Sequence, residues 1–187
     1  MLNNLLMEKL ISRDASVTME NVLCNSKSSS GGEEDLNFLK CLIDNKLLEQ
    51  EEKILKRTNI DFNEALYEEK YPKMKYESSR HYFCRAIIQD ELQKLGISTT
   101  YGSEAGNLNI LRTSSNYDIT AEDLSFLIDI GLTPARNYFK GLTDFKVKNY
   151  LISTYFDDYM DEIIFCSLKR NDDESFLEAV KNYTAIN

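Results

Sequence analysis

The side chains that could act as nucleophiles or proton carriers are few. His81 is the only histidine in the chain, so any Ser-His or Cys-His pair must use it. Cys84 follows three residues later, but neighbours at this spacing on a helix project outward side by side, and no third catalytic group is recognisable. The sequence therefore favours a non-catalytic protein, and we expect neither a catalytic residue nor a cofactor.

Carboxylates are concentrated in the string Asp-Asp-Tyr-Met-Asp-Glu at 157–162. On a helix, its acids at i and i+4 would project together and could share a hard cation. The string resembles the Asp-Asp-x-x-Asp motif of isoprenoid synthases, and this resemblance implies Mg²⁺ and a diphosphate substrate. The weak metal candidates are Asp157, Asp158, Asp161 and Glu162. A solvated acidic helix face explains the same pattern, so we assign no metal site. A Mg²⁺-dependent enzyme that uses these acids is our second alternative for the function.

Between residues 70 and 85, basic and aromatic side chains alternate. Such a mixture can hold phosphate, an RNA loop or an acidic partner, because aromatic rings stack while cations neutralise charge. An exposed loop whose lysines balance Glu68 and Glu69 explains the pattern equally well. This stretch is our leading candidate binding patch, and its members are Lys70, Tyr71, Lys73, Lys75, Tyr76, Arg80, His81, Tyr82 and Arg85.

Two further resemblances concern nucleic acids. Asp123–Leu142 is similar to a helix-turn-helix unit, although a pair of core helices explains it better. A helix, hairpin and helix with Glu104 and Asp118 resemble the core of restriction endonucleases. That core requires a strand with Glu-x-Lys or an equivalent, and Leu108–Arg112 contains no acid. We therefore reject the nuclease interpretation.

The composition indicates a globular protein outside the secretory pathway. Of the 187 residues, 42% are hydrophobic and 28% charged, and the formal net charge is −9. Such a charge disfavours nonspecific binding to phosphate backbones, although a local patch can still bind them. The N-terminus has no basic segment typical of an export signal, no apolar run is long enough to span a membrane, and the four cysteines lack Cys-x-x-Cys spacing. We expect reduced thiols and a cytoplasmic or nuclear location.

Hydrophobic periodicity predicts a mainly helical chain. Apolar residues at helical spacing predict one or two helices over 33–55, one over 79–95 that ends at Gly96, and further helices over 120–131, 134–142, 143–170 and 174–183. Alternating residues predict a small β-hairpin near 97–112.

The predicted fold is thus mainly α, in the sense of an α+β chain with one small hairpin: a compact helical domain with a mobile N-terminal helical arm. The predicted divisions are the arm at 1–24, a Ser/Gly linker or loop at 25–32, and a single domain at 33–187. We expect a protein-binding or regulatory subunit of a larger intracellular assembly. Nucleic-acid or ribonucleoprotein binding through the patch at 70–85 is the first alternative. A protein partner is expected, a nucleic-acid partner would use only the local patch, and no membrane is expected.

Overall fold

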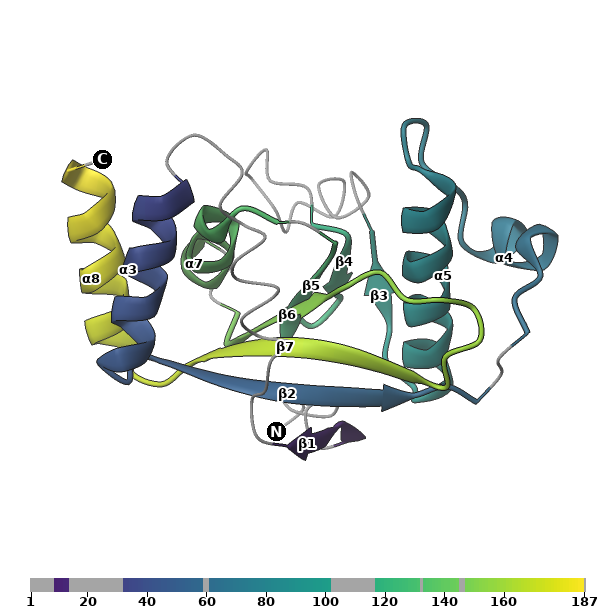
Figure 1. Cartoon of the computed structure of the whole chain (residues 1–187), viewed down its shortest axis with the longest axis horizontal. Helices are drawn as coiled ribbons and strands as arrows, with labels where there is room; N and C mark the ends of the chain where they lie inside the picture. Colours follow the sequence, from purple (N-terminus) through teal and green to yellow (C-terminus); the bar gives the residue numbers. More distant parts are fainter. Residues whose placement is uncertain are drawn as a thin grey trace.

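The computed structural model describes residues 9–13, 32–58, 61–101, 117–131, 133–144 and 147–186. Within these ranges, the chain contains both helices and strands, and the two types are mixed along the sequence (Figure 1). The strands are β1 (Ile11–Arg13), β2 (Leu48–Lys56), β3 (Thr99–Thr100), β4 (Ile119–Ala121), β5 (Phe126–Ile130), β6 (Asn149–Ser153) and β7 (Glu162–Arg170). The helices are α3 (Gly32–Asp44), α4 (Glu64–Lys70), α5 (Ser79–Lys94), α7 (Ala135–Asp144) and α8 (Asp173–Ile186).

The strands form one mixed sheet in the order β1-β2-β7-β6-β5-β4-β3. The pair β5 and β6 is parallel, and the other described pairs are antiparallel. A parallel pair requires a crossover between its strands, and α7 lies within that crossover. The sheet therefore organises the described fold, and the helices cover it.

The prediction of a mainly α fold was wrong, because the protein is α+β with a mixed sheet. The largest error fell on 143–170, predicted as one long helix, where the structure has β6 and β7. All five residues of β6 are buried, so this strand lacks the alternation of buried and exposed positions that marks a half-buried strand. The helix predicted over 120–131 is likewise replaced by β4 and the fully buried β5.

The predicted helix over 33–55 was correct only in its first part. Helix α3 ends at Asp44, and Lys46 adopts a positive φ of 60° that turns the chain into β2. Strand β2 is rich in Glu and Lys, which favour helices in isolation, but it pairs with β7 over nine residues. This long-range ladder overrides local propensity. The predictions of α5 and α8 were confirmed to within a few residues.

Each face of the sheet carries its own hydrophobic core. On one face, α3, α7 and α8 contribute Leu39, Phe139 and Phe176 to a cluster with Leu127 and Tyr150 of the sheet. On the other face, α5 packs through Ile87, Ile88 and Leu92 on sheet residues that include Ile128 and Phe165. Figure 1 shows α3 and α8 toward one end of the molecule and α4 and α5 toward the other. The fold is therefore a helix–sheet–helix sandwich.

Most of the predicted N-terminal arm and the whole Ser/Gly linker except Gly32 lie outside the described residues. The described part of the arm includes β1, a strand that pairs with β2 at the edge of the sheet. The first strand of the predicted hairpin corresponds to β3, which pairs with β4. The second predicted strand, at 108–110, also lies outside the described residues. Among the described helices, none has the length and apolar character required to cross a membrane.

Candidate functional site

The beginning of α5 and the residue before its cap bring three ionisable side chains together. Ser78 caps the helix, and its hydroxyl accepts a hydrogen bond from the amide of His81 at 3.2 Å. His81 and Arg85 lie four residues apart on α5, so they project from the same side of the helix, and Glu77, just before the cap, contacts both of them. We call these three residues, together with Asp118, the His81 network.

The His81 network is a chain of short contacts through the interior. The guanidinium of Arg85 donates to both carboxylate oxygens of Glu77, each at 2.8 Å. The imidazole of His81 lies between two acids, with Nδ1 2.7 Å from Glu77 Oε1 and Nε2 3.0 Å from Asp118 Oδ1. The side chains of Arg85 and Glu77 are 0% and 1% exposed. A buried bidentate pair of this kind is well satisfied, because each charge has its counter-charge.

The contacts within the network shift the pKa values of Glu77 and His81. Burial alone would raise the pKa of Glu77, but hydrogen bonds from Arg85 and His81 outweigh it and lower the pKa to about 2. Burial alone would lower the pKa of His81, but the hydrogen bonds to Asp118 and Glu77 raise it to about 9. His81 is therefore an imidazolium at neutral pH and cannot act as a general base there.

The network continues into the sheet through a second aspartate. Asp118 directly precedes β4, and its Oδ2 accepts a hydrogen bond from the amide of Ile130 at 2.7 Å. Asp129 accepts from the amide of Asp118 at 3.3 Å and from the hydroxyl of Tyr150 at 2.6 Å. Burial and the charge of Asp118 raise the pKa of Asp129. All four oxygens of the two carboxylates thus have a protein partner.

This arrangement bears directly on the nuclease interpretation. The strand beside β4 is β5, and it carries an acid, Asp129, which lies outside the segment 108–112 that was expected to form the strand. Two residues later stands Gly131, where the Glu-x-Lys pattern requires lysine. Among the described residues, no group of three or more His, Cys, Asp or Glu side chains is arranged to hold a metal ion. The geometry thus gives the nuclease interpretation no further support.

Cys84 does not supply a nucleophile to this network. Its thiol is fully buried and contacts the carbonyl of Phe156 at 3.8 Å. Burial raises the pKa of the thiol to about 11, so the reactive thiolate is scarce at neutral pH. The arrangement can therefore hold charge and orient α5 on the sheet, and Cys84 is not positioned as its nucleophile.

The residues of the predicted binding patch are divided between surface and interior. Tyr71, Tyr82 and Arg85 are buried, and His81 is held in the network. Lys70 forms an ion pair with Asp90 at 2.6 Å. The remaining members, Lys73, Lys75, Tyr76 and Arg80, lie wholly or partly at the surface. The structure brings all nine residues into one region, but only some of them face solvent, and a binding role for them stays a prediction.

The acidic string at 157–162 lies in the connection between β6 and β7. Residues 154–161 form a loop, and Glu162 begins β7. Side chains at i and i+4 project together only on a helix. Because these acids lie on a loop, their spacing does not bring them together as shared metal ligands.

A separate groove lies between α7 and α8, with a volume of about 600 Å³. Its apolar lining is formed by Phe139, Leu177, Val180 and Tyr183, and its cations are Arg136, Lys140 and Lys181. Arg136 is held by Asp35, with Nε 3.1 Å from Oδ2. Lys140 and Lys181 form no ion pair with a described residue, and no described acid lines the groove. Sequence reasoning missed this groove because its residues come from two helices about forty positions apart.

In comparisons with known proteins, no family model, no curated protein and no solved structure matches this chain. The class of protein is therefore defined by the fold alone, as an α+β protein with a mixed sheet between two helical layers.

Proposed function

We propose that the protein is a non-catalytic binding module that holds an acidic, amphipathic segment of a protein partner in the groove between α7 and α8. The observation that carries this proposal is the sign of the groove's charge. The chain has a net charge of −9, yet the charged side chains lining the groove are all cations.

The mixed lining of the groove favours a peptide over a nucleic acid. An apolar floor contributes by removing side chains such as Leu or Phe from water, which is worth about 1.5–3 kcal/mol for each fully buried side chain. A phosphate backbone would use the cations but not the floor. An amphipathic segment with carboxylates along one edge uses both, because helix-in-groove binding combines apolar anchors with charge at the rim.

A binding function also suits the chemistry of the interior. The His81 network is neutralised by its own members, and Cys84 is protonated and buried. We therefore propose a regulatory or accessory subunit of an assembly, in the cytoplasm or nucleus, rather than an enzyme.

The test uses two synthetic peptides of about 15 residues, or four helical turns, with the same leucine stripe. One has glutamates on its polar face and the other lysines, and binding to the intact protein is followed by fluorescence anisotropy. The variant K140E/K181E reverses the two unpaired charges of the groove. Its matched control, K75E, makes the same kind of change in the predicted patch at 70–85, where Lys75 is exposed.

We expect the acidic peptide to bind and the basic one not to bind. We also expect K140E/K181E to weaken binding at least tenfold, while K75E leaves it unchanged. If K75E weakened binding as much as the groove variant, the patch at 70–85 would be the binding site and the proposal would fail. Equal binding of the two peptides, or binding of neither, would also refute it.

A further inference from the structure

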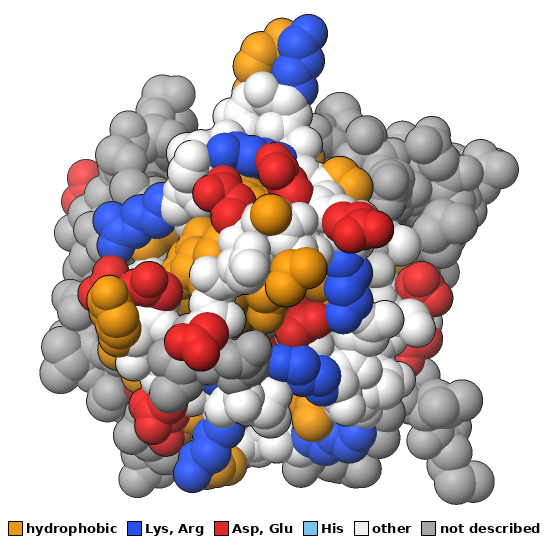
Figure 2. Space-filling view, turned by 90° about the vertical axis from the view of Figure 1, so that its right-hand side faces the viewer, with side chains coloured by type: hydrophobic (Ala, Val, Ile, Leu, Met, Phe, Trp, Pro, Cys, Tyr) orange, Lys and Arg blue, Asp and Glu red, His pale blue; other side chains and the backbone are white. Residues whose placement is uncertain are grey.

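A second pocket, of about 400 Å³, lies at the α4 and α5 end of the molecule. It is bounded by the beginnings of α4 and α5 and by the connection between β6 and β7. Its walls include the rings of Phe62, Phe83 and Phe156, and its acids are Glu64, Asp157 and Asp158. Figure 2 looks onto this end and shows hydrophobic side chains reaching the surface between acidic and basic ones.

The three phenylalanines form a continuous aromatic wall. The rings of Phe62 and Phe83 have centroids 4.5 Å apart and meet edge to face, with an interplanar angle of 75°. The ring of Phe156 continues the wall, 6.0 Å from that of Phe83. Phe156 is 7% exposed and the other two are half-buried, so packing fixes the wall while part of it stays accessible.

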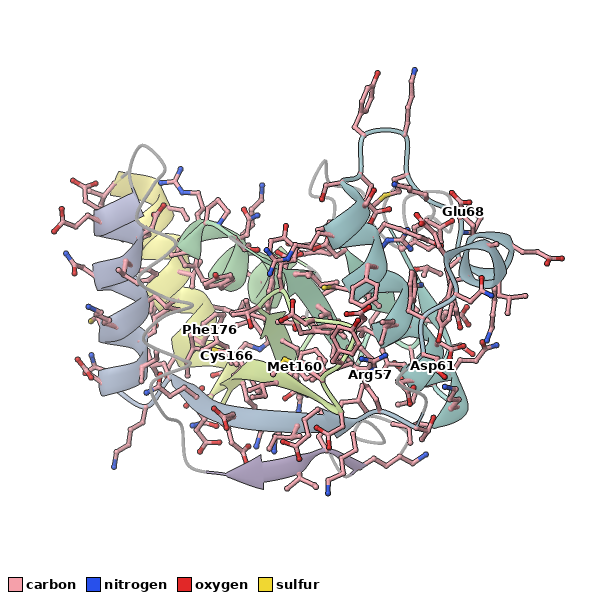
Figure 3. The ribbon with its side chains drawn as sticks, turned by 45° about the vertical axis from the view of Figure 1, so that its right-hand side comes forward. Arg57, Asp61, Glu68, Met160, Cys166 and Phe176 are labelled. Carbon is pink, nitrogen blue, oxygen red and sulfur yellow. The ribbon has the colours of Figure 1, made fainter. Side chains whose placement is uncertain are left out.

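The backbone that carries two of the carboxylates is anchored by a buried arginine. Nη1 of Arg57 donates to the carbonyl oxygens of Asp158 at 3.0 Å and Met160 at 2.8 Å, and Figure 3 labels Arg57 close to Met160. The amide of Met160 also donates to the carbonyl oxygen of Asp157 at 3.1 Å. The loop is therefore held in place before any ligand arrives.

The charge of the pocket is negative overall. Glu64, Asp157 and Asp158 are exposed and form no ion pair with a described residue. The single base among the described lining residues is Arg80, whose guanidinium lies 5.1 Å from the ring centroid of Tyr155. The described lining residues thus carry three carboxylates and one cation, a net charge of −2 beside the aromatic wall.

We propose that this pocket binds the side chain of an arginine presented by a partner protein. A guanidinium is planar and weakly hydrated, so it lies against an aromatic ring while its edge donates to carboxylates. A lysine ammonium is more strongly hydrated and lacks this flat shape. The site is separate from the groove of the proposed function, because it lies on the other helical layer and carries the opposite charge (Figure 1).

The test follows chemical shifts of the intact ¹⁵N-labelled protein during titration with three short blocked peptides, Gly-Arg-Gly, Gly-Lys-Gly and Gly-citrulline-Gly. Citrulline keeps the shape of arginine without its charge. The variants are F62L, which keeps an apolar side chain but removes a ring, and D157N/D158N, which removes two exposed charges. D44N is the matched control, since Asp44 is exposed at the end of α3 in the other helical layer.

We expect the arginine peptide to shift signals of residues that line the pocket, the lysine peptide to bind more weakly, and the citrulline peptide not to bind. D157N/D158N and F62L should each weaken binding of the arginine peptide about five- to tenfold, as expected for a lost charge contact or a lost aromatic face. D44N and K140E/K181E should have no effect. Citrulline binding as tight as arginine binding, unchanged affinity in both pocket variants, or no shift of pocket residues would each overturn the proposal.

Discussion

The raised pKa of His81 predicts that the free energy of unfolding falls as the pH rises, by an amount that follows from the structure. The imidazole is 17% exposed and lies between Glu77 and Asp118. These contacts raise its pKa from 6.5 to about 9, which corresponds to about 3 kcal/mol in favour of the folded, protonated state. This contribution is complete below pH 6.5 and is lost as the pH rises through about 9. Roughly 2 kcal/mol should disappear between about pH 6.5 and 8.5.

The groups around His81 determine the sign of the effect. Glu77 and Asp118 favour the imidazolium, whereas Arg85 beyond Glu77 opposes it weakly, and the ring of Tyr155 lies 6.3 Å away. Asp129 contributes in the same direction as His81, since its pKa is also raised in the folded state and its proton is also lost as the pH rises. The thiol of Cys84 titrates only at higher pH.

A direct assay is available because the chain contains one histidine. The proton NMR signal of its ring Hε1 can be followed from pH 5 to 10 without assignment of other residues. We expect a midpoint near 9. In parallel, urea unfolding at about pH 6.5 and 8.5 should show the loss of stability, and H81N should reduce that loss by about 2 kcal/mol. An imidazole midpoint near 6.5, or an equal pH dependence in H81N, would refute the charged network.

Three other predictions concern the interior. E77Q should lower the free energy of unfolding by about 3–5 kcal/mol in urea titrations, because it leaves the buried charge of Arg85 without its counter-ion; a loss below 1 kcal/mol would contradict the ion pair. G141A should cost about 1–3 kcal/mol, since a Cβ there would lie 2.6 Å from the buried ring of Tyr150; unchanged stability would show that this ring can move. Millimolar Mg²⁺ or Mn²⁺ should leave the melting temperature unchanged, because protein donors already occupy all four oxygens of Asp118 and Asp129; a rise in melting temperature that D129N abolishes would restore the metal-dependent nuclease interpretation.

The elements that sequence periodicity identified are those with a capped, local pattern. Helix α5 begins after Ser78 and is followed by Gly96 at a positive φ of 78°, and both signals are visible in the sequence. The buried strands β5 and β6 carry no such signal, because residues on both of their sides face a core and the alternation vanishes. Their identity depends on pairing with strands distant in the sequence, which periodicity cannot detect.

The candidate site was predictable to the same limited extent. The spacing of Glu77, His81 and Arg85 at i, i+4 could have indicated a charged cluster at the beginning of α5, but His81 and Arg85 were assigned to the candidate binding patch at 70–85. Nothing in the sequence indicates that Asp118, nearly forty residues from His81, completes the network, because this contact exists only when α5 packs on the sheet. The groove and the aromatic pocket depend in the same way on helices and loops brought together by the fold.

The two proposed binding surfaces lie on opposite layers of the sandwich, with the sheet between them. The groove is lined by cations and the pocket by carboxylates, so partners of opposite charge would not compete for one surface. A close-packed interior transmits little displacement unless an element has two arrangements, and the His81 network holds α5 in one. Saturating the groove with the acidic peptide should therefore leave the affinity of the pocket for the arginine peptide unchanged. A shift of more than about fivefold would correspond to a coupling of about 1 kcal/mol and would show that the two layers move together.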